Sequence, residues 1–415
     1  MEIKNLVNDQ GMYLYKDTSF NTIKINMSFI ANPNSREGAI YDLLCGYIVK
    51  ANKKIPQESI EGLTSDLYSL IVEVDTEMYY NYRFFNFTLD LVSPTVVNDD
   101  YSKDAFNFAK KILLYPDFKR KDILEAVKRT IIYDFKEKFQ NNFNNSMFSY
   151  FDKVFPKKER SYYCDLDINY IENLFNTITL KDLEKLYHQT INKKQFYRGF
   201  VFGNITDQEY KYFRKTFTYK SRIPNLDFKY DIIPKEDTII IPCENTEQSH
   251  IYLTYSIDKL DDNIRFILHD ILNGSSSLCH NIIRDKYGLS YSPSAYIFNS
   301  SNMLYVYAAI DKKNIDTFIK AVDEIIKTLQ DEEKMKPLFE RAKESVKLND
   351  YLISENRDEM FEVLNSYIMG ATSFAEIDEQ FDNIKEEDIT KSTKTLKRVN
   401  TFIYRGDAKW IIIKK

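Results

Sequence analysis

The stretch 274–291, GSSSLCHNIIRDKYGLSY, carries the strongest local pattern in this 415-residue chain. Serines that can cap free backbone N–H groups precede an apolar-periodic run, which predicts a helix beginning near Leu278. Gly288 is expected to end this helix and Tyr291 to start a strand. Arg284 falls in the last helical turn, seven residues before Tyr291, so both side chains can point into one groove. The alternative is a capped helix with a surface arginine and a core tyrosine.

The order of elements around this stretch is repeated elsewhere in the chain. Two pairs of similar segments carry the repeat: 178–183 with 384–389, and 66–70 with 285–289. Segments 178–183 and 384–389 each open a helical pattern, which is followed by a strand that ends at Gly203 or Gly406. Because the pairs share an offset of roughly 200 residues and the same order, the sequence predicts a two-fold repeat.

Each half of the repeat is expected to form one domain. Segment 216–237 contains Pro224 and Pro234, which remove backbone donors and discourage a continuous helix, so a linker is expected there. The predicted domains are residues 1–215 and 238–415. In both, helical segments alternate with antiparallel-type strands rather than with regular βαβ units, which indicates the α+β class.

Hydrophobic periodicity places the main elements within these domains. Strands are expected at 22–30, twice within 70–91, at 251–256 and within 291–310. Helices are expected at 37–50, 105–114, 121–139, 264–273, 278–287 and 315–329.

Composition excludes several classes of function. The chain has 57 Lys and Arg against 62 Asp and Glu, a net charge of −5, so it gives no bulk reason to expect nucleic-acid or anionic-membrane binding. With only 10 glycines, it contains neither GxGxxG nor GxxxxGK[ST]. No apolar run approaches a membrane span, and the beginning, MEIKNLVNDQG, lacks the apolar core of a secretory signal. Four scattered cysteines do not suggest a disulfide framework, so a cytoplasmic location is expected.

The pattern G-x-x-S-x-L-x-x-x-I-R-x-K-x-G-L-x-Y at 274–291 resembles the C-terminal-domain signature of the pitrilysin/insulinase metallopeptidases, which carry an inverted zinc motif. Segments 113–118, 200–205 and 342–349 also resemble landmarks of that family. The resemblance implies two homologous domains, each an antiparallel-rich sheet packed with helices, which together form one half of a clamshell. It also implies that Arg284 and Tyr291 contact a bound peptide substrate.

The zinc-binding half of the family pattern is degenerate. The HxxEH motif places two histidine ligands at i and i+4 of a helix, with a glutamate beside them as general base. In the matching helix here, Tyr41 and Cys45 stand at the ligand positions and Leu44 at the position of the base. The third ligand falls at or near Asp134. These residue types cannot hold zinc tightly and activate water, and the neighbouring Asp42 is expected to be a solvated helix residue.

Other candidate ligands do not restore a metal site. The histidines, at 188, 250, 269 and 280, include no pair spaced by four residues. His280 lies one turn before Arg284 and is expected to be an exposed or hydrogen-bonded side chain. No CxxC motif is present, so neither zinc nor another cofactor is expected in this chain.

The resemblance implies a non-catalytic subunit of a heterodimeric zinc endopeptidase. A homologous HxxEH chain would supply the zinc, this chain would supply Arg284 and Tyr291, and the substrate would be an unfolded peptide. Processing of the leader or precursor of a ribosomal peptide is one such role. The alternative is a zinc-free structural core or scaffold subunit of a larger assembly. No nucleic acid or membrane partner is expected.

Overall fold

The computed structural model describes residues 5–31, 35–79, 82–155, 168–191, 195–218, 220–221, 236–244, 246–258, 260–274, 276–298, 302–369 and 381–407. The chain folds into two units, each built from three segments of sequence. The first unit contains Met1–Lys136, Asp167–Phe228 and Asn356–Thr372, and the second contains Glu137–Leu166, Lys229–Glu355 and Ser373–Lys415. In the described residues, no helix combines the length and apolar character needed to cross a membrane.

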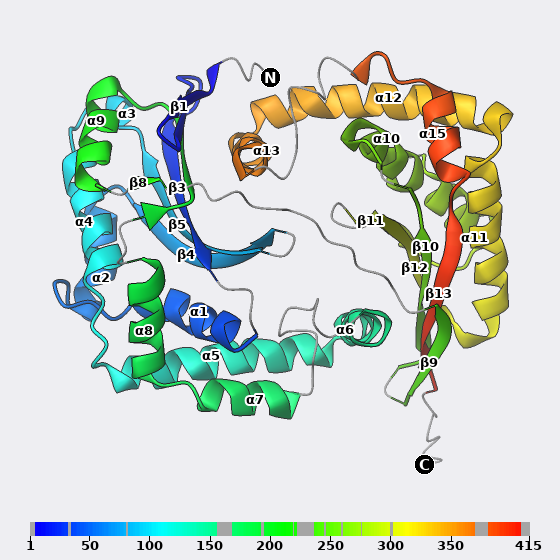
Figure 1. Ribbon diagram of the computed structural model, residues 1–415, viewed down its shortest axis with the longest axis horizontal. Helices are drawn as coiled ribbons and strands as arrows, with labels where there is room; N and C mark the ends of the chain where they lie inside the picture. Colours follow the sequence, from blue (N-terminus) through cyan, green and yellow to red (C-terminus); the bar gives the residue numbers. More distant parts are fainter. Residues whose placement is uncertain are drawn as a thin grey trace, which may run out of the picture. The chain divides into compact units, whose positions relative to one another are not determined.

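Each unit is built around one mixed sheet (Figure 1). In the first unit the strand order is β1 (Val7–Asp9), β2 (Met12–Lys16), β7 (Arg198–Gly203), β3 (Thr22–Ala31), β5 (Tyr82–Val92) and β4 (Ile71–Tyr79). In the second unit it is β9 (Asp237–Cys243), β13 (Lys397–Gly406), β10 (Gln248–Ser256), β12 (Met303–Asp311) and β11 (Ser294–Ile297). A further two-stranded pair joins β6 (Gln195–Phe196) to β8 (Lys220–Ser221).

The two sheets have the same topology from β2 to β4 and from β9 to β11. The β2–β7 and β9–β13 pairs are parallel, and every other pair in these five-stranded sets is antiparallel. The helix that precedes β7 begins with a capping box at Thr179, and at the start of the helix that precedes β13 the carboxylate of Asp388 accepts the backbone N–H of Lys385 at 2.9 Å. The predicted α+β class and two-fold repeat are therefore confirmed.

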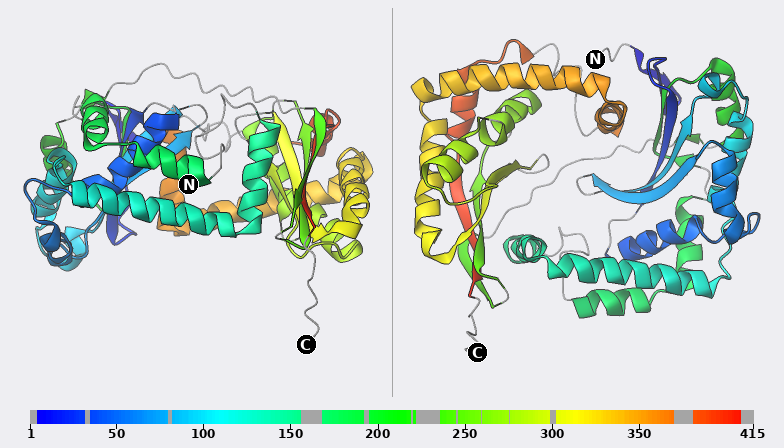
Figure 2. Two further views of the ribbon diagram at one scale, coloured as in Figure 1. Left: turned by 90° about the horizontal axis from the view of Figure 1, so that it is seen from below. Right: turned by 180° about the vertical axis from the view of Figure 1, so that it is seen from behind.

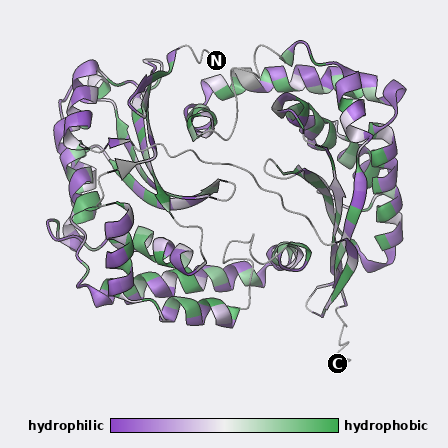
Figure 3. Cartoon of the chain, viewed as in Figure 1, coloured by the Kyte–Doolittle hydropathy of each residue, from purple (hydrophilic) through white to green (hydrophobic). Residues whose placement is uncertain are grey.

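Helices cover these sheets. Those of the first unit are α1 (Ser35–Ile48), α2 (Gln57–Asp66), α3 (Pro94–Val97), α4 (Ser102–Leu114), most of α5 (Lys121–Gln140), α7 (Ile168–Asn176), α8 (Leu180–Thr190), α9 (Asp207–Thr216) and α13 (Arg357–Met369). Those of the second unit are α6 (Asn142–Val154), α10 (Asp262–Asn273), the π-helix η4 (Cys279–Lys286), the 3₁₀ turn η5 (Lys312–Asn314), α11 (Ile315–Leu329), α12 (Glu332–Glu355) and α15 (Glu386–Thr393). Green apolar residues and purple polar residues alternate along these helices (Figure 3), as expected for elements that bury one face.

Both faces of the first sheet are covered. On one face, Ile25 and Met27 of β3 are fully buried, and Phe85 of β5 lies on the same face. The ring of Phe85 lies 6.2 Å from that of Tyr41 on α1. The opposite face carries Phe200 of β7, which is also fully buried. Because side chains alternate along a strand, these two sets require separate helical layers.

Helix α13 covers the second of these faces, although its sequence lies between segments of the other unit. The ring of Phe361 stacks on that of Phe200, with centroids 5.0 Å apart and planes at 21°. The ammonium group of Lys24 lies 4.5 Å from the centroid of the Phe361 ring. Apolar packing and a cation–π contact therefore hold the centre of α13 on the sheet.

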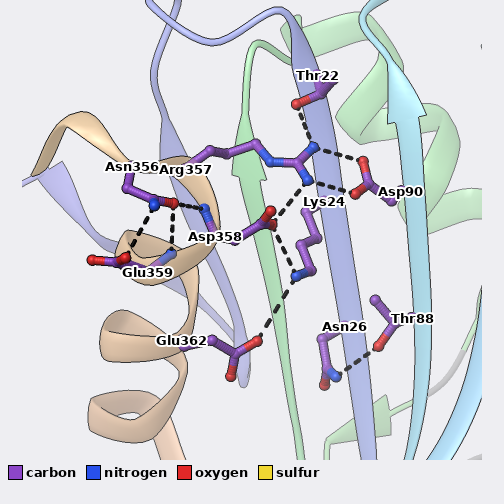
Figure 4. Close-up of polar contacts among 10 residues, drawn as sticks. All are labelled: Thr22, Lys24, Asn26, Thr88, Asp90, Asn356, Arg357, Asp358, Glu359 and Glu362. Atoms are coloured by element: carbon purple, nitrogen blue, oxygen red, sulfur yellow. Dashed lines mark hydrogen bonds and ion pairs between the residues drawn. The ribbon is translucent and has the colours of Figure 1, made fainter. Parts of the chain in front are cut away.

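Ion pairs fix the first turn of α13 on the same face (Figure 4). The guanidinium of Arg357 donates two parallel hydrogen bonds of 2.8 Å to the carboxylate of Asp90 and one of 2.7 Å to the hydroxyl of Thr22. Lys24 donates to Asp358 at 3.2 Å. The side chain of Asn356 caps the helix by accepting from the backbone N–H groups of residues 358 and 359.

Helix α6 plays the matching role in the second unit, against β10 and β13 (Figure 2). Tyr150 stacks on Tyr252 with ring centroids 4.5 Å apart, and its hydroxyl lies 2.8 Å from that of Thr254. Ser146 and Tyr252 are linked by a further 2.8 Å hydrogen bond. The aromatic residues of this face are thus covered by a helix from the first half of the sequence.

These exchanged helices make the units differ from the linear division predicted from the sequence. Segment 137–166, within the predicted domain 1–215, belongs to the second unit, and segment 356–372, within the predicted domain 238–415, belongs to the first. Most of the predicted linker, 216–237, lies outside the described residues.

We expect Arg357→Met to lower the free energy of unfolding of the first unit by about 2 kcal/mol, because it removes a bidentate, partly buried ion pair and leaves Asp90 without this cation. Urea unfolding followed by tyrosine fluorescence measures the effect. Arg120→Met is the matched control, since the bidentate pair of Arg120 with Asp122 is exposed. Equal effects of the two substitutions would show that the Arg357 pair does not anchor α13.

Candidate functional site

The stretch 274–291 folds in the second unit as the π-helix η4 and the turn that follows it. The hydroxyl of Ser277 accepts the backbone N–H of His280 at 3.2 Å, so the predicted serine cap is present. Cys279, Ile282 and Ile283 are buried on the face of η4 that joins the core of this unit. The predicted helix 278–287 is therefore confirmed in place but has wider π-type turns, a form that is often found at functional sites.

Glycine ends this helix as predicted. Gly288 has φ +61°, the left-handed conformation of a glycine that ends a helix, and the N–H of Leu289 reaches back to the carbonyl of Ile283 at 3.0 Å. The N–H of Tyr287 donates to the carbonyl of Ile282, five residues earlier. This ending turns the chain sharply and sends the next residues back along the end of the helix.

The turn brings Arg284 and Tyr291 together. The guanidinium carbon of Arg284 lies 4.4 Å from the centroid of the Tyr291 ring, a close cation–π contact. The side chain of Arg284 is 41% exposed, and Tyr291 is 78% exposed. The interpretation of Tyr291 as a core residue is therefore wrong. Its expected position at the start of a strand is also wrong, because β11 begins at Ser294 after the turn.

Neighbouring residues hold the end of η4 in place. Lys286 donates hydrogen bonds of 2.7 and 2.8 Å to the carboxylate of Glu324 on α11, and the hydroxyl of Tyr287 donates to the same carboxylate at 3.0 Å. The hydrogen bond from Lys286 lowers the pKa of Glu324. Two residues that follow Arg284 are thus tied to a second helix, while Arg284 itself contacts the exposed ring.

A side-chain clasp closes the base of the stretch. Asn273, the last residue of α10, donates from Nδ2 to the carbonyl of Ala295 at 2.8 Å, and its Oδ1 accepts the N–H of Ala295 at 2.8 Å. The amide of Asn273 thereby takes the place of a neighbouring strand beside β11, which is an edge strand. Sequence reasoning missed this residue; its only signal was an amide residue directly before Gly274, in the position where α10 ends.

The degenerate zinc motif lies on α1 in the first unit, and its residues are packed as core side chains. Leu44 is fully buried, and the hydroxyl of Tyr41 lies 2.6 Å from that of Thr190 on α8. Cys45 is a free, buried thiol, and burial together with the nearby Asp42 raises its pKa well above its ordinary value. A protonated thiol, a hydrogen-bonded phenol and an aliphatic side chain do not fit a zinc ion, which requires anionic or imidazole ligands.

Asp134 does not complete this set. It is exposed on α5, whereas Tyr41, Leu44 and Cys45 are buried. Within the residues that the structure describes, no three His, Cys, Asp or Glu side chains are grouped as a metal site. His280 is partly buried and its backbone is bonded to Ser277, and Cys164 lies outside the described residues.

The expectation of a solvated Asp42 is wrong. Its side chain is only 13% exposed, and its carboxylate accepts a 2.8 Å hydrogen bond from the hydroxyl of Thr76 on β4. Sequence periodicity did not indicate the burial of Asp42. A carboxylate on an apolar helix is buried only where another element supplies its partner, and here that partner is Thr76 of β4.

Comparison with known proteins agrees with this geometry. Residues 177–346 match the protein-family model described as the Peptidase M16 inactive domain. This part of the chain is therefore similar to the inactive domain of the M16, or pitrilysin-type, peptidases. The resemblance noted in the sequence is thus confirmed. Among curated proteins, no sequence is similar enough to this chain to count as a match.

Several solved structures share the fold of this chain. A conserved protein from Enterococcus faecalis V583 superposes with a TM-score of 0.81 at 16% identity, over 98% of this chain and 100% of that one. A protease from Helicobacter pylori gives 0.72 at 13% identity, over 96% and 98%. A peptidase M16 inactive domain from Pseudomonas fluorescens gives 0.70 at 13% identity, over 98% and 100%. At these identities the likeness shows a shared fold.

The Asn273 clasp should restrain the turn that carries Tyr291. We expect Asn273→Leu to speed amide hydrogen exchange at Ala295 by roughly tenfold or more. The substitution removes the partner of both the N–H and the carbonyl of Ala295. Exchange is followed by mass spectrometry of peptides that cover 288–298. Asn281→Ala, in the same stretch but bonded to Ser276, serves as the control. Unchanged exchange at Ala295 in the Asn273 variant would rule out the clasp.

Proposed function

We propose that this chain is the non-catalytic, substrate-binding subunit of a heterodimeric zinc endopeptidase that cleaves unfolded peptides. A homologous chain with an intact HxxEH motif would hold the zinc and activate the attacking water. The observation that carries the proposal is the combination, within one chain, of a zinc motif replaced by core side chains and an exposed Arg284–Tyr291 pair.

The Arg284–Tyr291 pair has the chemistry needed to hold a peptide. Arginine provides several N–H donors in a planar fork, which suit a peptide carbonyl or the oxyanion that forms on it during hydrolysis. Tyr291 orients the guanidinium from one side through its ring and carries a phenolic donor of its own. Contacts to the peptide main chain would tolerate many substrate sequences, as expected for the processing of a leader or precursor peptide.

The anchoring of η4 also favours this role. A catalytic or binding side chain must be held near its working position before the substrate arrives. The bonds from Lys286 and Tyr287 to Glu324, and the Asn273 clasp, fix the two ends of the turn without covering Arg284. A scaffold subunit, the alternative role, has no need of an exposed pair prepared in this way.

The test combines this chain with the HxxEH-bearing homologue from the same organism and follows cleavage of a quenched fluorescent, unfolded peptide. We expect activity only when the two chains are mixed, and we expect chelation of zinc to abolish it. Arg284→Ala should lower kcat/KM of the mixture by at least about tenfold. Arg341→Ala, an exposed arginine on α12 of the same unit, is the control and should leave the rate unchanged.

Two results would overturn the proposal. One is full activity of the mixture with Arg284→Ala. The other is purification of the chain in a large assembly that contains no HxxEH protein, which would support the scaffold role.

A further inference from the structure

A buried arginine lies beside the degenerate zinc motif. Arg83, near the start of β5, is 2% exposed and is among the largest fully buried side chains of the described residues. It shares a face of the sheet with Phe85, the face that packs on α1. Arginine keeps its charge in proteins, so a buried guanidinium is tolerated only where a carboxylate and hydrogen bonds compensate it.

The compensating groups come from two other elements. Nη1 of Arg83 donates to the hydroxyl of Thr76 on β4 at 3.2 Å, and that hydroxyl donates in turn to Oδ1 of Asp42 on α1 at 2.8 Å. Nη1 of Arg83 also lies 3.9 Å from Oδ1 of Asp42. The Asp42–Thr76–Arg83 bridge therefore connects α1 to both strands of the β4–β5 hairpin through one cation.

The bridge acts on the turn that would carry the metal. Asp42 directly follows Tyr41 and lies one turn before Cys45, so the bridge is attached within the degenerate motif itself. The charge of Arg83 also reaches the thiol of Cys45, where it partly offsets the effect of burial and of the nearby carboxylates. Arg83 offsets part of the negative charge of Asp42 and Asp75 near this turn, and so weakens the attraction of the turn for a divalent cation.

We propose that Arg83 takes the structural place of a metal ion in the first unit. It joins the motif helix to the sheet through Asp42 and Thr76, and it excludes zinc from the turn between Tyr41 and Cys45. This inference concerns the first unit alone and is independent of whether a peptidase partner exists.

A double-mutant cycle on the full-length chain tests the bridge. Asp42→Asn leaves a buried cation without its carboxylate, and we expect it to lower the melting temperature by roughly 6 °C or more. Arg83→Met combined with Asp42→Asn should melt higher than Asp42→Asn alone, because the uncompensated charge is gone. The control is Asp122→Asn, which breaks the exposed pair with Arg120. Additive shifts, or an Asp42→Asn shift as small as that of the control, would overturn the bridge.

A zinc-binding measurement tests whether Arg83 excludes zinc. A purely structural arginine would not change the amount of zinc bound. The changes Tyr41→His, Leu44→Glu, Cys45→His and Asp134→Glu are introduced together, once with Arg83 and once with Arg83→Met. Folding is checked by circular dichroism, and zinc retained after dialysis is measured by atomic emission. We expect roughly tenfold more zinc in the Arg83→Met protein. Equal zinc contents of the two proteins, high or low, would overturn the exclusion.

Discussion

Each of the two sheets has two faces that carry large apolar side chains, and each half of the sequence provides helices for only one of them. The exchange of α6 and α13 between the halves meets this requirement. Phe361 covers Phe200 in the first unit, and Tyr150 covers Tyr252 in the second. Aromatic rings at these positions would otherwise leave an apolar surface of considerable size in water, at a cost of roughly 25 cal/mol for every Å². Helix α1, which carries the degenerate zinc motif, and η4 are both positioned by sheets whose two faces are covered in this way.

The repeat, the α+β class and most elements could be predicted because they depend on local patterns. The alternation in β3 and the capping box at Thr179 are visible within a few residues of sequence. The helix exchange could not be predicted, since the pairing of Arg357 with Asp90 joins residues 267 positions apart. The strand start expected at Tyr291 was wrong for a related reason: the strand begins only after the turn, where Ser294 pairs with Tyr307 of β12.

The candidate site was predictable in part. The spacing of Arg284 and Tyr291 indicated that both side chains can point into one groove, and the helix end expected at Gly288 was confirmed. The residues that hold them, Asn273 and Glu324, could not be found, because they act through contacts that only the folded chain creates. In the first unit, Tyr41, Leu44 and Cys45 were recognised as unsuited to zinc, but Arg83 reads in the sequence as an ordinary charged residue of a hairpin.

Because each unit contains a helix from the opposite half of the gene product, cutting the polypeptide at its middle would not yield two autonomous domains. A fragment ending near residue 215 would keep α6 without the strands it covers, and would expose Phe200. Evolution could therefore shuffle, fuse or separate such halves only as a matched pair. This architecture favours inheritance of the duplicated chain as a single indivisible module.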